Sequence, residues 1–182
     1  PMQQPFDQIK NSQRIALLKS ATEAARGVSP EVTQIVAGYL DKVQRVSIIT
    51  SDGAWVADER PRTRGYVRAV AMLDGAAQTG FEGPGCCRGF EAYRSAIDLD
   101  EAGRTAAQTA VTMLHAPECP AANLPVVIDG GFGGVIFHEA CGHSLEATSV
   151  AKGNSVFCGK LGERIASDRV TAVDDGTLLN EW

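Results

Sequence analysis

Two histidines and a glutamate form the part of this sequence best suited to catalysis. His138 is followed directly by Glu139, and His143 comes five residues after the first histidine. In the common zinc-peptidase pattern, His-Glu-x-x-His, both histidines bind one zinc ion and the glutamate acts as general base in hydrolysis. The residue types therefore predict a Zn²⁺ site with His138 and His143 as metal ligands and Glu139 as the catalytic base.

The spacing of this motif is one residue longer than the common pattern, which has a geometric consequence. Each residue turns an α-helix by about 100°, so five steps place two side chains about 140° apart. Rings at that angle cannot share one metal ion in a regular helix. A local π-type turn would bring them together, and Gly142 would alternatively let the helix unwind before His143. We therefore predict a distorted or terminating helix at Cys141-Gly142.

The neighbouring polar residues leave the rest of the site open. Glu146 could be a third ligand, a partner that orients the His143 ring, or an ordinary surface charge. Cys141 could bind a soft metal, although a small buried thiol is the more common role, and Cys158 has the same two possibilities. His115 ends a predicted helix, where an interaction with the helix C-terminus is expected.

The residue pattern of the motif segment is also compatible with a structural role or a nucleotide site. Histidines on an apolar helix are often core residues held by hydrogen bonds. An unpaired Glu139 would be costly to bury in such a helix, which favours a metal site. A strand, glycines and a helix also resemble a dinucleotide-binding fingerprint. However, Ile136 stands where the third glycine is required, and no strand–helix alternation indicates a parallel sheet.

Helices and strands that must position the motif follow from hydrophobic spacing and turn residues. One helix is predicted from a cap at Asn11 or Ser12 to Gly27, and another over about 100–115 with Asp98 or Asp100 as its cap. Between them a period of two predicts a meander of four or five antiparallel strands. These strands cover Val32–Tyr39, Arg45–Thr50, Ala54–Asp58, Gly65–Leu73 and Ala76–Phe81, with tight turns at Ser51-Asp52-Gly53 and Asp74-Gly75.

Downstream we expect a short strand over 125–129, a glycine turn over 130–134, the motif helix and a last strand over 169–173. The predicted fold class is α+β: an antiparallel β meander packed with helices, in which the motif helix follows a short strand and a Gly-rich turn. With 182 residues, the chain has the length of one domain, and we treat 1–182 as a single α+β domain.

Composition excludes several classes of protein. Hydrophobic residues make up 44% and charged residues 21%, which is ordinary for a globular chain. No apolar stretch is long enough to cross a bilayer, so no membrane partner is expected. The formal net charge of −5 gives no support for a nucleic-acid partner. Five cysteines in no framework spacing and a polar start without signal-peptide features favour reduced thiols and a cytoplasmic location.

Beyond the two histidines, a longer pattern resembles the TldD/PmbA metallopeptidase family, historically labelled modulators of DNA gyrase. The resemblance rests on His138-Glu139-Ala140-Cys141-Gly142-His143-Ser144-Leu145-Glu146, on Ser155-Val156-Phe157 and on Val173-Asp174-Asp175-Gly176-Thr177. The Ser51-Asp52-Gly53 turn and the run from Asp58 to Arg64 extend it over most of the chain.

The resemblance implies a function and a larger protein. It implies zinc on His138 and His143, Glu139 as the catalytic glutamate, and hydrolysis of small or unfolded peptides inside the cell. It also implies a homo- or hetero-oligomer with a related subunit, of which this chain resembles the motif-bearing kind. A third ligand, a cysteine, is implied far downstream, so we expect the chain to be the central part of a longer protein that lacks its C-terminal domain. The alternative is a non-catalytic regulatory or assembly module of the gyrase-modulator type.

Overall fold

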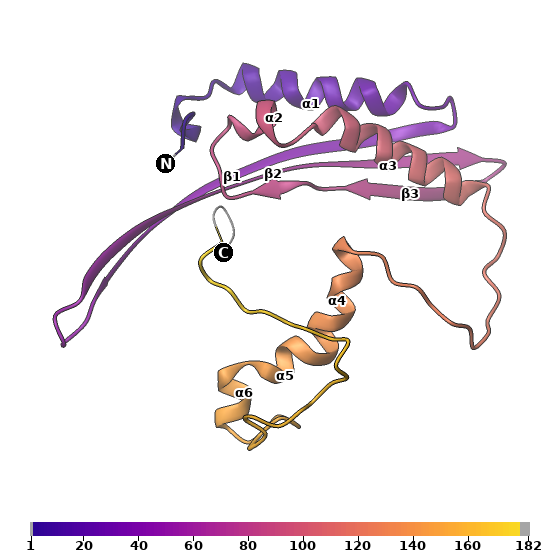
Figure 1. The fold of residues 1–182 in the computed structure, drawn as a ribbon. Coiled ribbons are helices and arrows are strands. Elements are labelled where there is room, and N and C mark those ends of the chain that lie inside the picture. Colours follow the sequence, from indigo (N-terminus) through magenta and orange to yellow (C-terminus); the bar gives the residue numbers. More distant parts are fainter. Residues whose placement is uncertain (1, 179–182) are drawn as a thin grey trace. The chain divides into compact units, whose positions relative to one another are not determined.

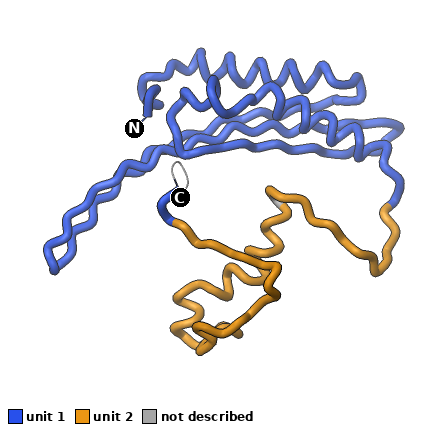
Figure 2. The backbone as a smooth tube through the Cα atoms, viewed as in Figure 1, with its two compact units in different colours: residues 1–118, 176–182 blue, residues 119–175 orange. Residues whose placement is uncertain are grey.

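The computed structural model describes residues 2–178, which form two compact units (Figures 1 and 2). Unit 1 contains residues 2–118 and 176–178, and unit 2 contains residues 119–175. Helices and an antiparallel sheet are both present, which confirms the α+β class. Among the described residues, none of the helices combines the length and the apolar character that a membrane span requires.

A twisted antiparallel sheet is the centre of unit 1 (Figure 1). Its strands are β1 (Val32–Ile49), β2 (Trp55–Leu73), β3 (Ala76–Glu82) and the short β4 (Gly85–Cys86). The order is β1-β2-β3, and β4 pairs with β2 beyond the end of β3. Both predicted turns are confirmed. Gly53 and Gly75 have φ values of 93° and 83°, a left-handed conformation that glycine adopts without strain.

The prediction of four or five short strands in this region was wrong. Residues 40–44 and 59–64, expected to interrupt the strands, are instead part of two long continuous strands. Their polar side chains find partners across the strands and in the core: Arg45 Nε lies 2.9 Å from Glu59 Oε2, and Thr63 is buried at 4% exposure. Pro61 is tolerated in β2 because backbone N–H groups point to alternate sides along a strand. The nitrogen of Pro61 faces the same side as that of Gly65, whose N–H points away from β1 and donates to Pro84 O, so Pro61 removes no hydrogen bond to β1.

Two helices cover one face of this sheet (Figure 1). They are α1 (Asn11–Arg26) and α3 (Leu99–Leu114), which matches the predicted helices to within a residue or two. The shared core is built mostly from small side chains. Its buried members are Ala21, Ala25, Val32, Val67, Ala69, Ala71, Leu99, Ala102, Ala106, Ala107 and Ala110. Small residues let helix and sheet backbones approach closely, which keeps this layer thin.

Helix ends follow local capping chemistry. Asp98 caps α3, because its Oδ1 accepts the N–H of Glu101 at 2.9 Å, as predicted. The N-cap of α1 is Lys10 rather than Asn11 or Ser12, and Gln13 Oε1 accepts the Lys10 N–H at 3.1 Å. Between the sheet and α3, the short helix α2 (Ala92–Ser95) carries Tyr93, whose hydroxyl lies 3.0 Å from Thr63 Oγ1.

Unit 2 contains only helical elements and connecting segments among its described residues. After η2 (Gly131–Gly133) come α4 (Gly134–Phe137), η3 (His138–Gly142), α5 (His143–Leu145) and α6 (Ala147–Ala151). The predicted strands over 125–129 and 169–173 were wrong, because neither run pairs with a strand among residues 2–178. Apolar runs need a partner strand to form a ladder, and here they stay exposed, as for Val127 at 99%.

Candidate metal centre

The helix that carries the motif contains a π-helical segment at the place where the sequence required one. Residues 134–145 run as α4, η3 and α5, and η3, from His138 to Gly142, has π geometry. The extra residue per turn restores the angle that five-residue spacing loses. The centroids of the His138 and His143 rings consequently lie 4.3 Å apart. The predicted distortion at Cys141-Gly142 is confirmed, and its form is the π turn rather than an unwound end.

Three of the predicted site residues come together on this helix. Ligand atoms of His138, Glu139 and His143 all lie within 4.8 Å of one another. Two nitrogens that bind one tetrahedral zinc at about 2.0–2.1 Å would lie about 3.3 Å apart. Small rotations of the side chains would therefore bring these ligand atoms close enough to bind one ion. Two imidazoles and a carboxylate are donors that suit zinc and other first-row transition metals. The residues present therefore fit a metal ion.

All three cluster residues are exposed, although the sequence suggested a buried Glu139. The side chains of Glu139 and His143 are 66% and 51% exposed, so Glu139 does not lie in an apolar interior. Apolar neighbours on the same helix are exposed as well, among them Ile136 at 59% and Phe137 at 45%. Exposure of such residues is typical of a surface that another part of a protein covers.

Glu146 orients the second histidine. Its Oε1 lies 2.7 Å from His143 Nδ1, and because a carboxylate only accepts, the imidazole donates its Nδ1–H. This bond leaves Nε2 as the free acceptor, 3.9 Å from Glu139 Oε2. The same hydrogen bond is the main reason why the pKa of His143 is raised. Of the three roles left open for Glu146, the structure shows the orienting contact.

The other candidate ligands lie outside the cluster. Cys158 Sγ lies 3.3 Å from the carbonyl oxygen of Val150, and none of the five cysteines forms a disulfide within the part of the chain that the structure describes. His115 Nε2 lies 2.9 Å from the carboxylate of Glu31, so its partner is an acidic side chain directly before β1. Cys141 is half-buried within η3 and does not belong to the group that could hold a metal.

The contacts of Ser155 at this site were not predicted from the sequence, where Ser155 appears only as part of the family pattern. Ser155 Oγ donates to the Ser144 carbonyl at 2.5 Å and accepts the N–H of Phe157 at 3.0 Å. These two bonds fasten the segment after α6 to the end of the motif helix. The local signal is a serine two residues before an N–H that its hydroxyl can accept, which identifies a turn but not its distant partner.

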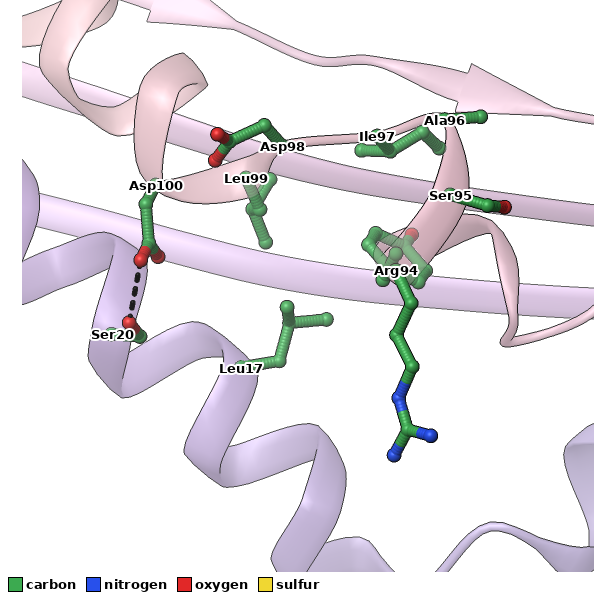
Figure 3. Close-up of a pocket in the computed structure, with 10 residues that line it drawn as sticks. Leu17, Ser20, Arg94, Ser95, Ala96, Ile97, Asp98, Leu99 and Asp100 are labelled. Carbon is green, nitrogen blue, oxygen red and sulfur yellow. Dashed lines mark hydrogen bonds between the residues drawn. The ribbon is translucent and has the colours of Figure 1, made fainter.

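Unit 1 has a separate pocket of about 530 Å³ between α1 and the segment from α2 to the start of α3 (Figure 3). Asp100 Oδ2 accepts the Ser20 hydroxyl at 2.7 Å at its edge, and the Arg94 side chain projects away from that pair. Its lining residues include no histidine and no cysteine. Its chemistry therefore differs from that of the His–Glu–His cluster.

Fold and cluster together define an α+β protein whose His-Glu-x-x-x-His helix carries a cluster that could hold a metal ion. Sequence models of the PmbA/TldA metallopeptidase central domain and C-terminal domain match residues 4–114 and 121–182, respectively. The chain belongs to this family, the TldD/PmbA family that its motifs resemble. The motif helix lies in the segment matched by the C-terminal model.

Curated relatives carry metalloprotease names. The chain is 33% identical over 180 residues to the "Metalloprotease TldD homolog" of Haemophilus influenzae, covering 97% of this chain and 37% of the relative. It is 34% identical over 147 residues to a "Metalloprotease" of Methanothermobacter thermautotrophicus, covering 81% and 32%. The chain thus spans about a third of the length of these relatives.

Solved structures share the fold. A protein of Bacteroides thetaiotaomicron described as a candidate modulator of DNA gyrase matches with a TM-score of 0.76 at 17% identity, covering 92% of this chain and 38% of that one. A protein of Thermotoga maritima with the same kind of description matches with a TM-score of 0.73 at 21% identity, covering 87% and 36%.

The two family models meet between residues 114 and 121, close to the boundary between the two compact units. From the sequence, residues 1–182 are predicted to be one domain from the central part of a longer protein. Compactness describes contacts and not independent folding, so the single domain stays a prediction.

Proposed function

We propose that this chain supplies two zinc ligands and the general base of a peptidase that hydrolyses small or unfolded peptides inside the cell. The observation that carries the proposal is the π segment, which brings His138, Glu139 and His143 together despite their unusual spacing. A helix with π geometry at one turn is rare and occurs mostly at functional sites. The metalloprotease names of the relatives support the same class of reaction.

In this proposal each residue has a separate role. His138 and His143 would hold the ion, and Glu146 keeps the His143 ring oriented with Nε2 free. When bound, the ion supplies Lewis acidity, which favours deprotonation of water and polarises a peptide carbonyl. Glu139 is exposed and lies 3.9 Å from His143 Nε2, which supports a role in which its carboxylate accepts a proton and returns it to the leaving amine.

Metal content tests the ligands directly. We expect about one equivalent of zinc per chain after loading and desalting, and loss of that zinc in His138→Ala and in His143→Ala. His115→Ala is the matched control, because it removes the only other histidine, which pairs with Glu31. Zinc retained by both ligand variants, or lost equally from the control, would refute the assignment. Elemental analysis of each purified protein gives the answer.

Peptide hydrolysis tests the base. In the protein that carries this chain, Glu139→Gln should keep its zinc and lose about 10²–10⁴-fold in kcat, the usual contribution of a general base. Glu163→Gln, which changes an exposed glutamate in the turn after residue 160, should hydrolyse peptides at the parent rate. Undiminished hydrolysis by the Glu139→Gln protein would remove the mechanism.

The alternative is a non-catalytic regulatory or assembly module. It draws support from the gyrase-modulator descriptions of the structural neighbours. In that case partner binding would be unchanged by Glu139→Gln, and no metal-dependent turnover would occur. Homo- or hetero-oligomerisation with a related subunit remains part of both hypotheses.

A further inference from the structure

The sheet carries a groove on the face opposite α1 and α3. Along β2, buried positions such as Val67 and Ala69 alternate with positions that point to the other face. The residues that line the groove come from β1, β2 and β3 and enclose about 370 Å³: Val36, Leu40, Arg64, Tyr66, Arg68 and Phe81. Ligand pockets span about 300–1,000 Å³, so this groove suits a few side chains rather than a folded partner.

A glycine makes room for the aromatic floor of this groove. Gly38 lies opposite Tyr66 in the β1–β2 ladder, and a Cβ on Gly38 would overlap the Tyr66 ring. The ring therefore lies across Gly38, close to the sheet. It stacks with the ring of Phe81, with centroids 6.2 Å apart and an interplanar angle of 28°. Any larger residue at position 38 would displace the Tyr66 ring, so Gly38 fixes the floor of the groove.

Two arginines flank this aromatic stack. Arg64 and Arg68 stand two residues before and after Tyr66, and both guanidinium groups lie 5.8 Å from the centroid of the Phe81 ring. Arg64 Nε also donates to the carbonyl oxygen of Gly83 at 3.0 Å. Within residues 2–178 neither guanidinium group forms an ion pair, and no carboxylate lines the groove. Four other arginines each pair with an acidic side chain: Arg14, Arg45, Arg60 and Arg104.

The order basic–aromatic–basic along one face of β2 defines the complementary ligand. Side chains at positions i, i+2 and i+4 of an extended peptide lie on one face and span about 13 Å. A peptide with acidic, apolar and acidic residues at these positions therefore matches Arg64, Tyr66 and Arg68 in turn. Guanidinium and carboxylate groups form bidentate hydrogen bonds, and the aromatic stack is left for the apolar side chain. A peptide C-terminus, with one carboxylate, would satisfy only one arginine.

We propose that this groove binds an extended acidic peptide segment of the pattern acidic–x–apolar–x–acidic, whose two carboxylates pair with Arg64 and Arg68. The central apolar side chain packs on the aromatic stack. Single-stranded nucleic acid also combines stacking with arginine contacts. A polyanion is disfavoured relative to a peptide with two charges, because the chain has a net charge of −5. The contact uses none of the His–Glu–His residues, so it is a binding activity beyond the proposed hydrolysis.

Isothermal titration calorimetry with capped peptides tests the ligand. The probe is acetyl-Ser-Glu-Ser-Leu-Ser-Glu-Ser-amide, whose caps remove both terminal charges. The protein is the full-length protein that carries this chain, in its Glu139→Gln form so that hydrolysis does not consume the probe. We expect one peptide per chain, bound at least about tenfold more weakly when both glutamates are replaced by glutamine. Equal affinities for the two peptides, no binding of either, or tighter binding of a seven-nucleotide oligothymidylate would overturn the proposal.

Substitutions in the groove test the site. Arg64→Gln and Arg68→Gln should each weaken binding of the glutamate peptide at least about threefold and reduce its advantage over the glutamine peptide. Arg26→Gln is the matched control, because it removes the same charge from an exposed arginine in the last turn of α1, which covers the other face of the sheet. An equal loss in this control, or undiminished binding by both groove variants with unchanged circular dichroism, would overturn the proposal.

Discussion

At the scale of single residues, we expect Glu146 to govern how well His143 can bind a metal in the proposed site. Its carboxylate holds Nδ1 at 2.7 Å and so fixes both the ring orientation and the tautomer. Outer partners of this kind typically contribute 10–100-fold to metal affinity. We therefore expect Glu146→Gln to weaken zinc binding by about that factor, measured by competition with a chelating indicator. Glu163→Gln should bind zinc as the parent does, and equal affinities in all three proteins would contradict the role.

The protonation of His143 gives a second prediction at this scale. The hydrogen bond to Glu146 is the main cause that raises the pKa of His143 above 6.5; desolvation opposes it, and the charges of Glu146 and Glu139 add to it. The metal-free fold is therefore stabilised by this proton below the ordinary pKa, and the stabilisation is lost as pH rises through the raised pKa. Zinc has the opposite dependence, because it needs the unprotonated ring.

Ring titration by NMR on metal-free protein should place the midpoint of His143 above 6.5. In Glu146→Gln that midpoint should fall toward the ordinary value. A parent midpoint at or below 6.5 would contradict the effect of the contact.

The site residues could be predicted from the sequence because their types and order specify the chemistry. His138, Glu139 and His143 were predicted on that ground, and the structure brings them together. The role of Glu146 stayed open, since three-residue spacing is compatible with a contact, a ligand or a solvated charge. The exposure of Glu139 was missed because apolar neighbours suggest burial only when something covers them.

At the scale of elements, the π segment sets the angle between the two histidines. Deleting Ala140 would shorten the spacing to His-Glu-x-x-His, which a regular α-helix presents on one face. We expect this deletion variant to retain zinc, with the π turn replaced by α geometry. Inserting one alanine after Cys141 instead would leave the rings about 140° apart even with the π turn retained, and should abolish zinc binding. Zinc retained after the insertion would show that zinc binding does not depend on the angle between the two histidines around the helix axis.

The contact between α3 and β3 depends on a glycine. A Cβ on Gly80 would overlap the carbonyl oxygen of Ala106, which is helix backbone and cannot rotate away. Gly80→Ala should therefore lower the free energy of unfolding by about 1–3 kcal/mol or more, measured by urea denaturation. Thr79→Ala, on an exposed neighbour in the same strand, should change it by no more than about 0.5 kcal/mol. Equal effects would contradict a close approach at Gly80.

Helices and turns were predictable because their signals are local. Asp98 caps α3, and Gly53 and Gly75 adopt the positive φ that the turn residues imply. Strand lengths were not predictable, since polar residues within β1 and β2 resemble loops until the cross-strand partner is known. The predicted strands over 125–129 and 169–173 were wrong for the converse reason, because residues with strand propensity form no strand without a partner strand.

At the scale of the whole molecule, the two units are joined by an exposed segment without regular structure. Residues 119–129 have no helix or strand, and Leu124 is 60% exposed. Limited chymotrypsin digestion should cut first near Leu124 and release an N-terminal fragment, which contains α1, the sheet and α3 and resists further cleavage. Mass spectrometry identifies the cut, and circular dichroism of the fragment should retain both helix and strand. Early cleavage within α3 would contradict the division into units.

The organisation of the whole molecule was the least accessible to prediction. Nothing in the local pattern near residue 118 marks a boundary more strongly than an ordinary loop does, although the contacts and the family models both change there. Similarly, the tip of the β1–β2 hairpin, residues 46–58, could be predicted as strands but not as a projection past the helices (Figure 1), because its exposure depends on how far the helices extend along the sheet.

The small-residue layer between α1, α3 and the sheet has a consequence for how this protein can change during evolution. Where a core is built from large side chains, most harmful substitutions remove atoms and leave cavities. Here alanine and glycine already occupy most of the contact positions, so little remains to be removed. We therefore expect purifying selection to act mainly against enlargement. Drift at these positions should exchange alanine, glycine and serine, while the outer helix faces diversify freely.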